Sequence, residues 1–107
     1  RAEEEAARRR EQYDFAVSRA VARLNVLAEL CLPYVKVGGQ FFAMKAAAAR
    51  EELGQAEKGI RALGGTVETL REYELEGAAR AIVVIRKTAP TPPKYPRPYA
   101  KIKQKPL

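Results

Sequence analysis

The sequence predicts an α/β fold whose sheet is mainly parallel and closes with an antiparallel pair of strands. Strand-like and helix-like stretches alternate through most of the chain, which is typical of parallel strands joined by right-handed crossover helices. Two strand-like runs then follow each other, separated only by a Gly-containing turn. At 107 residues the chain is long enough for one domain with a modest core. The expected element order is therefore β-α-β-α-β-β.

The first strand is expected at Tyr13–Arg19, after a short exposed helix at Arg1–Gln12. In the helix the acids come first and the bases one to two turns later, an order that suits the helix dipole. In the strand, the alternation predicts that Phe15 and Val17 are buried. Arg19 would then lie at the carboxyl end of this strand.

A packing helix is expected between Ala20 and Leu32. Its apolar residues recur at helical spacing and form one stripe, and Pro33 ends or kinks the helix. Cys31 lies on this stripe and is expected to act as a small buried hydrophobe rather than as a nucleophile, because the chain has no His to activate it.

The stretch Val35–Lys45 is the centre of the predicted fold. Gly38-Gly39 is expected to form a corner with positive φ, and the apolar run Phe41–Met44 to form a strand covered on both faces. Ligands of α/β sheets collect beyond the carboxyl ends of the strands, so Lys45 is a candidate for facing a substrate. The alternative is that Lys45 only marks a solvated strand end.

The remaining elements complete the sheet. A second crossover helix is expected from Ala46 to Leu63, with Gly64-Gly65 as its stop. Strands are expected at Thr66–Leu75 and Arg80–Lys87, joined by a turn, and the β-branched residues of the second run indicate an interior strand.

Net charge is concentrated at the carboxyl end of the chain. Residues 1–85 carry 13 basic and 13 acidic residues, whereas residues 86–107 carry seven basic residues, no acid and six of the seven prolines. Such a segment is poor at building a core. We therefore expect a folded part at residues 1–87 and a basic Pro-rich tail at residues 88–107 that binds a polyanion such as RNA. The alternative is that the tail packs back on the body through Tyr95, Tyr99 and its prolines.

Cysteine and histidine usage limits the possible chemistry. A single Cys and no His argue against a disulfide framework and a Cys/His metal site, and they fit a reducing compartment such as the cytoplasm. No apolar run approaches the length of a membrane span, so neither a membrane nor a metal is an expected partner. The start at Arg1, without a Met, leads us to expect a piece of a longer protein.

Several short motifs in a fixed order resemble the RsmG family, also called glucose-inhibited division protein B. The resemblance covers nearly the whole chain, and the ordered combination is more specific than any one motif. The motifs include Arg1-Ala2-Glu3, Ser18-Arg19-Ala20, Leu32-Pro33-Tyr34, Ala43-Met44-Lys45 and Thr91-Pro92-Pro93-Lys94.

The resemblance implies the second half of a Rossmann-like methyltransferase that uses S-adenosylmethionine, with strands four to seven and an antiparallel last strand. It implies that the intact protein, a monomer, methylates guanine N7 of 16S ribosomal RNA in the small ribosomal subunit. The Gly-rich cofactor loop of such enzymes has no counterpart in this sequence. The chain by itself is therefore expected to be inactive.

Site residues follow from the resemblance by matching position. Ala2 and Glu3 would line the adenosine pocket of the cofactor, and Arg19 would be a further cofactor-site residue. Position and charge, rather than this matching, make Lys45 at its strand end and Lys94 and Arg97 in the basic tail the candidates for contact with the RNA.

Guanine N7 carries a free lone pair at neutral pH, so methyl transfer to it requires no general base. The absence of His and of a recognisable acid/base pair is therefore compatible with this reaction, which depends on in-line positioning. The competing hypothesis is a non-catalytic RNA-binding module, in which a neutral α/β body displays the basic tail. A strand followed by a Gly-rich turn upstream of Arg1 would favour the enzyme.

Overall fold

The computed structural model describes residues 9–19, 22–46 and 49–107. Its elements are strand β1 (Tyr13–Ser18), helix α2 (Leu24–Cys31), the 3-10 helix η1 (Leu32–Tyr34), strand β2 (Val35–Lys45), helix α3 (Ala49–Ala62), strands β3 (Gly65–Leu75) and β4 (Ala78–Lys87), and helix α4 (Tyr99–Gln104). The predicted order of strands and helices is confirmed up to β4. Helix α4 lies within the segment that was expected to be a tail.

The four strands form one sheet in the order β1-β2-β4-β3. β1 and β2 are parallel, whereas β4 is antiparallel to both β2 and β3. The β-branched run of β4 is therefore an interior strand, as its composition predicts. The result is a mixed α/β sheet whose last strand runs against its neighbours.

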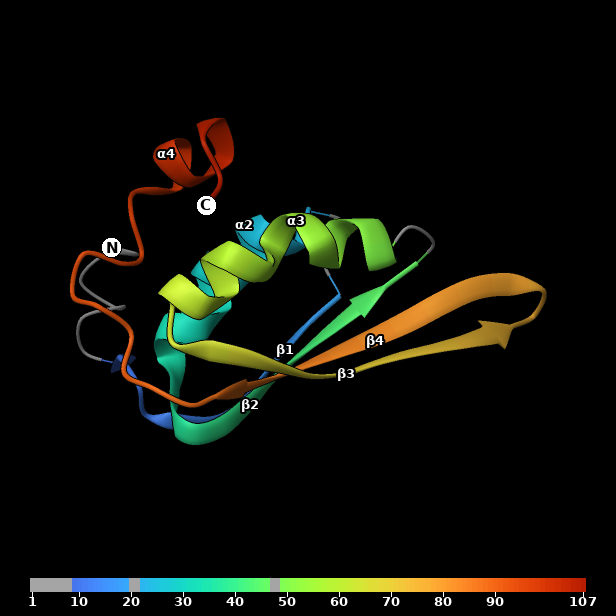
Figure 1. The fold of residues 1–107 in the computed structure, drawn as a ribbon, viewed down its shortest axis with the longest axis horizontal. Helices are drawn as coiled ribbons and strands as arrows, with labels where there is room; N and C mark the ends of the chain where they lie inside the picture. Colours follow the sequence, from blue (N-terminus) through green and yellow to red (C-terminus); the bar gives the residue numbers. More distant parts are fainter. Residues whose placement is uncertain (1–8, 20–21, 47–48) are drawn as a thin grey trace.

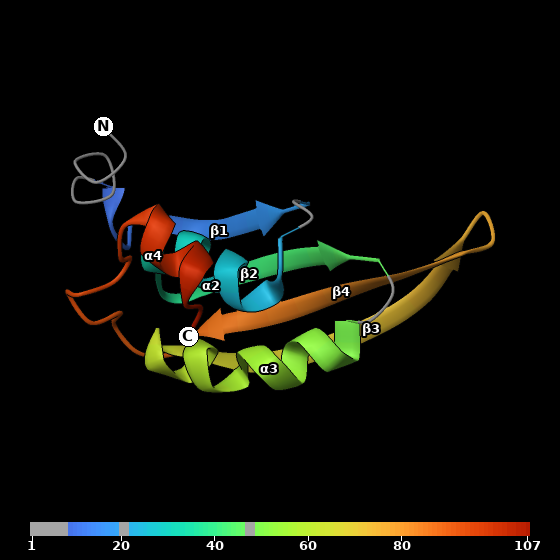
Figure 2. The same ribbon diagram turned by 90° about the horizontal axis from the view of Figure 1, so that it is seen from above.

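Both long helices pack on the same face of this sheet (Figure 1). α3 runs beside β3, and α2 lies over β1 and β2 (Figure 2). The core between the layers is built from alternate residues of the strands and the apolar stripes of the helices. Its members include Leu24, Leu27, Phe41, Ala43, Ile60, Val83 and Ile85.

The prediction that Phe15 and Val17 are buried is wrong, because each is 62% exposed. Ala16 is paired with Phe41, a residue of the core, and it is Ala16 that packs toward the helices. Side chains alternate along a strand, so Phe15 and Val17 project from the opposite face. Among the described elements no helix covers that face, and β1 is an edge strand.

The Gly-Gly pair is not a corner before a strand but a bulge inside β2. Tyr13 pairs with Val35 and Phe15 with Gln40, so two steps along β1 match five along β2. Gly38 has a φ of 93°, which favours glycine. A Cβ atom on Gly39 would lie only 2.5 Å from the carbonyl oxygen of Asp14. Position 39 therefore requires glycine for β1 and β2 to approach each other this closely.

The helix boundaries differ modestly from those expected. α2 begins at Leu24, and the side chain of its N-cap residue, Arg23, makes no capping hydrogen bond. α3 ends at Ala62, and Gly64, two residues later, has a φ of 91°, which confirms the predicted glycine stop. At the amino-terminal end, Arg10 and Glu11 form a turn rather than the last part of a helix, and residues 1–8 of that expected helix lie outside the described residues.

Residues 88–107 do contribute to the core, which corrects the expectation drawn from their composition. Ile102 is fully buried and Tyr95 is 8% exposed, while Leu107 contacts the helix residue Gly59. The alternative that the tail packs back is confirmed for Tyr95, but Tyr99 is 54% exposed. Within the described ranges, no helix combines the length and apolar character of a membrane span.

Candidate functional site

The carboxyl ends of β1 and β2 meet at one edge of the sheet. The two strands are parallel, and Ser18 is paired with Ala43, so Arg19 and Lys45 lie just beyond this register at the same edge. In α/β sheets this edge is where ligands bind. We call it the carboxyl edge, and Arg19 is exposed there.

Lys45 is held inside the protein at this edge. Its side chain is 6% exposed, and its Nζ atom donates a 2.7 Å hydrogen bond to the carbonyl oxygen of Ala22 and lies 3.0 Å from Oε1 of Glu52. The alternative that Lys45 marks a solvated strand end is therefore wrong. Because its charge is paired with a carboxylate, Lys45 connects Ala22 and α3 to the end of β2 rather than presenting a free cation.

Glu52 connects three elements at the carboxyl edge. Glu52 lies in the first turn of α3 and forms an ion pair with the Lys45 ammonium. It also accepts a 2.9 Å hydrogen bond from the backbone N–H of Leu24. Leu24 is the first residue of α2, so Glu52 satisfies one of the free N–H groups at the start of that helix. Glu52 thereby joins the end of β2 to the start of α2.

Ala2 and Glu3 lie outside the described residues, so their assignment to the adenosine pocket stays a prediction. In the described part of the chain, no group of His, Cys, Asp and Glu has the arrangement of a metal site. Cys31 packs against the core, and burial raises the pKa of its thiol to about 11. At neutral pH it is therefore a poor nucleophile.

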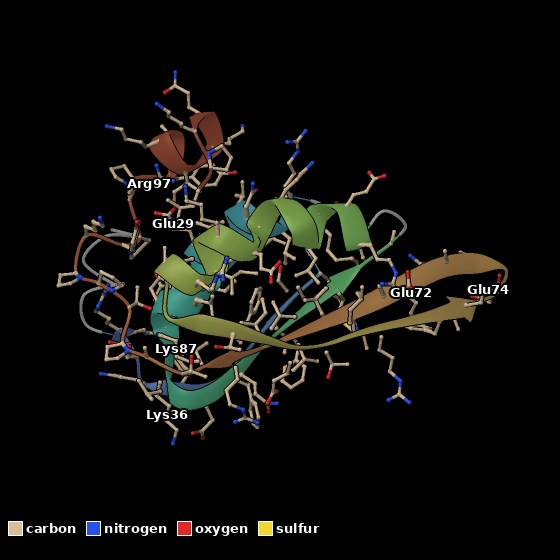
Figure 3. All side chains as sticks on the ribbon, in the orientation of Figure 1. Glu29, Lys36, Glu72, Glu74, Lys87 and Arg97 are labelled. Atoms are coloured by element: carbon tan, nitrogen blue, oxygen red, sulfur yellow. The ribbon has the colours of Figure 1, made fainter. Side chains whose placement is uncertain are left out.

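Arg97 joins the C-terminal segment to α2. Its guanidinium donates to both carboxylate oxygens of Glu29, with a shortest distance of 2.8 Å, and Glu29 is fully buried (Figure 3). Glu29 also accepts a 2.8 Å hydrogen bond from the backbone N–H of Arg97, and hydrogen bonding to Glu29 raises the pKa of the guanidinium. A second donation reaches the carbonyl oxygen of Lys105. Arg97 is thus engaged with the protein itself.

Lys87 forms a similar buried contact at the end of β4. Its side chain is fully buried and donates to the carbonyl oxygens of Leu32 and Val35, while Oε2 of Glu11 lies 3.1 Å from its Nζ atom. Burial lowers the pKa of Lys87, and the hydrogen bond to Glu11 opposes that shift. Two carbonyls and a carboxylate together satisfy the ammonium.

Arg10 holds the proline-containing turn that follows β4. Its guanidinium donates to the carbonyl oxygens of Thr91, Pro92 and Tyr95. Beside it, Oε2 of Glu11 accepts from the backbone N–H of Thr91 at 3.1 Å. Residues before β1 therefore fix residues after β4.

Sequence reasoning missed the carboxylates that organise both ends of the sheet: Glu11, Glu29 and Glu52. Glu29 alone left a signal, because it is the only charged residue within α2 and follows a run of buried apolar positions. Lys94, a predicted RNA contact, is exposed and its ammonium lies 5.3 Å from the centre of the Tyr95 ring.

Residues 1–83 match the family model GidB, described as rRNA small subunit methyltransferase G. The chain belongs to this family. The predicted resemblance is therefore confirmed, and the GidB match includes the carboxyl edge with Arg19 and Lys45. It stops before Lys94 and Arg97.

Curated relatives in the GidB family carry the name ribosomal RNA small subunit methyltransferase G. The chain is 53% identical over 90 residues to the protein of Staphylococcus carnosus and 54% identical over 90 residues to that of Bacillus subtilis. A third relative, from Symbiobacterium thermophilum, is 52% identical over the same length. Each alignment covers 82% of this chain but only 37–38% of the relative, so the chain spans less than two-fifths of their length.

Proposed function

We propose that the intact protein transfers the methyl group of S-adenosylmethionine to guanine N7 of 16S ribosomal RNA in the small ribosomal subunit. The observation that carries this proposal is the GidB match across residues 1–83, which includes the whole carboxyl edge. The relatives' printed name supports the class of reaction and of RNA. The target atom and the methyl donor are inferred from the resemblance.

The described residues fit one side of such a cofactor site. The carboxyl edge includes the end of β1, an edge strand of the described sheet, and it presents the exposed guanidinium of Arg19. A guanidinium suits a carboxylate or another hydrogen-bond acceptor of a bound molecule. The Gly-rich loop that would cradle the cofactor is not in this sequence, so the complete site requires more of the protein than these residues.

When bound, S-adenosylmethionine supplies an electrophilic methyl group. In the proposed reaction the N7 lone pair of guanine would form the new N–CH3 bond as the S–CH3 bond breaks, and the positive charge would pass from sulfur to the purine. No proton leaves N7, so the protein needs positioning and exclusion of water rather than a general base. Arg19 would orient the cofactor, and Ala2 and Glu3 would line its adenosine pocket.

Within this proposal Lys45 holds the carboxyl edge in place rather than contacting RNA. Its bonds to Ala22 and Glu52 join the end of β2 to the residues before α2 and to α3. A substitution at Lys45 would therefore disturb the packing of this edge rather than remove an RNA contact. We further propose that the intact enzyme acts as a monomer in the cytoplasm.

The test uses the full-length protein, small ribosomal subunits and S-adenosylmethionine labelled in its methyl group. We expect label in 16S ribosomal RNA and strand cleavage at the modified base after borohydride and aniline treatment, which detects 7-methylguanosine. Label at another atom would contradict the N7 assignment. Binding to the subunit without any methyl transfer would favour the non-catalytic RNA-binding module.

Arg19→Ala in the same protein tests the cofactor role of this residue. Loss of a hydrogen bond to a charged group costs about 1.5–3 kcal/mol, so cofactor affinity measured by calorimetry should fall about 10-fold or more. The free energy of unfolding should change by no more than about 0.5 kcal/mol, as for other exposed residues. The control is Arg80→Ala, an exposed position in β4 near the hairpin turn. Unchanged cofactor affinity of the Arg19 variant would remove Arg19 from the site.

A further inference from the structure

The seven cations of residues 86–107 fall into two groups. Three of them are paired with carboxylates from the rest of the chain: Arg86 with Glu68, Lys87 with Glu11 and Arg97 with Glu29. The other four are exposed and make no ion pair with a described residue: Lys94, Lys101, Lys103 and Lys105. Their segment contains no acid, so their charge is not compensated locally.

The backbone that carries these four lysines is packed against the rest of the protein and is not a free chain end. Ile102 is fully buried, and Tyr95 is part of the hydrophobic core. Thr91 donates a 2.6 Å hydrogen bond to the carbonyl oxygen of Leu63. Together with the Arg97–Glu29 pair, these contacts fix the backbone between the lysines. A fixed array loses less conformational entropy on binding than a flexible tail does.

Helix α4 sets the positions of three of the lysines. Ile102 points inward, so its neighbours Lys101 and Lys103 lie on the two flanks of the helix. Lys105 follows the last residue of α4, and its backbone N–H donates a 2.9 Å hydrogen bond to the carbonyl oxygen of Lys101. On the other flank the Lys103 ammonium lies 5.9 Å from the centre of the exposed Tyr99 ring. Cations therefore border the outer surface of α4 on both sides.

We propose that the segment from Lys94 to Lys105 binds the phosphodiester backbone of RNA. Its chemistry is that of a sequence-independent phosphate surface, with lysines that form no ion pair with a described residue and an exposed tyrosine on which an unstacked base can rest. An acidic polypeptide is the other polyanion to consider, but the tyrosine beside the lysines favours a nucleic acid. The choice of RNA rests on the proposed function. The family match ends at residue 83, so this surface lies outside the matched part.

The surface lies at the opposite end of the sheet from the carboxyl edge. β1 and β2 point away from α4, and the C-terminal segment gathers at the end where β4 finishes (Figure 2). An RNA bound at the carboxyl edge would have to extend along the domain to reach the lysines. The lysines are therefore expected to add affinity without touching the reacting base.

The test compares two double variants of the full-length protein. Lys101→Gln with Lys105→Gln removes two exposed charges from α4 and the residue that follows it. Arg71→Gln with Arg80→Gln removes two exposed charges from the β3–β4 hairpin, which lies away from α4, at the same end of the molecule as the carboxyl edge (Figure 1). Binding of a 16S ribosomal RNA fragment is measured over a range of salt concentrations, together with the kcat and KM of methyl transfer.

We expect the Lys101/Lys105 variant to bind RNA more weakly and with a flatter salt dependence. If both lysines neutralise phosphates, the slope of log affinity against log salt should flatten by about 1.4–1.8, from 0.7–0.9 per contact. KM for the RNA should rise while kcat stays unchanged, and the hairpin variant should keep the original slope. An unchanged slope, or equal flattening in both variants, would overturn the proposal.

Two further outcomes separate this inference from the proposed function. If the wild-type protein bound RNA with the expected difference in slope but transferred no methyl group, the methyltransferase proposal would fail and the phosphate surface would stand. If methyl transfer were normal and the Lys101/Lys105 variant lost only its retention on immobilised polyglutamate, the partner would be an acidic protein and the RNA assignment would be wrong. Melting temperatures of both variants confirm that each is folded.

Discussion

The two ends of the sheet are each held by a buried lysine, but they are organised differently. At the carboxyl edge, Lys45 pairs with Glu52, which belongs to the next helix of the chain. At the other end, Lys87 pairs with Glu11, which precedes β1. The first pair closes a local connection, whereas the second joins segments from opposite ends of the chain.

The two ends of the sheet also differ in which residues they expose to solvent. Arg19 remains exposed at the carboxyl edge, beside the edge strand β1. The opposite end is covered by residues 88–107, whose backbone carbonyls are held by Arg10 and whose Arg97 reaches Glu29. One end is thus suited to a ligand that enters a site, and the other to a partner that lies on a surface. Substitutions at the two ends should accordingly affect different properties.

The largest effect is expected from breaking the Arg97–Glu29 pair. In the intact protein, Arg97→Ala leaves the fully buried Glu29 carboxylate without its charged partner. We expect a loss of about 2–3 kcal/mol in the free energy of unfolding, less than for a fully buried pair because Arg97 is 21% exposed. Urea denaturation followed by circular dichroism measures this loss.

Lys36→Ala is the matched control for that experiment. Lys36 lies 2.6 Å from Asp14, but both side chains are more than half exposed and Lys36 points away from the body (Figure 3). Exposed pairs contribute at most about 1 kcal/mol. Equal losses for Arg97→Ala and Lys36→Ala would show that the C-terminal segment is not anchored by Glu29.

A smaller effect concerns the pH dependence of stability, and it tests the end of the sheet that residues 88–107 cover. Because burial lowers the pKa of Lys87 below its ordinary 10.5, the folded protein releases this proton before the unfolded chain does. Between the two pKa values the unfolded state binds more protons, so the free energy of unfolding contributed by Lys87 rises with pH.

The measurement compares wild type with Lys87→Met, which cannot titrate at this position. From pH 8 toward pH 10.5, the stability of wild type relative to the variant should increase. The comparison removes the contributions of groups that titrate equally in both proteins. A relative stability that falls over this interval would mean that pairing with Glu11 outweighs burial.

The smallest effect is expected in the rate at which the Cys31 thiol, in helix α2, is alkylated. Cys31, whose pKa is about 11, should react slowly with iodoacetamide at pH 8, because only its thiolate is nucleophilic. In urea the same thiol should react faster, since its pKa returns to about 8.5 in the unfolded chain. Mass spectrometry at successive times measures both rates. Equally fast alkylation in the native protein would contradict the burial of this helix face.

Local patterns were sufficient for the order of the elements from β1 to β4, although not for α4. The β-branched residues of β4 predicted an interior strand, Gly64 predicted the end of α3, and the alternation of strands and helices predicted parallel pairing of β1 and β2. The ordered motifs also predicted the family that the comparison confirmed. These features depend on hydrophobic periodicity and backbone preferences, which act over a few neighbouring residues.

The tertiary structure decided which side chains face the core and which charged residues pair with each other. The side-chain alternation of β1 was readable, but which face met the helices depended on its register with β2, so Phe15 and Val17 were assigned to the wrong face. The seven C-terminal cations look alike in the sequence, and only the fold assigns three of them to distant carboxylates and leaves four lysines exposed. Ion pairs such as Glu29 with Arg97 join residues 68 positions apart. No local pattern encodes such a contact, because it forms only after the layers have packed and removed both groups from water.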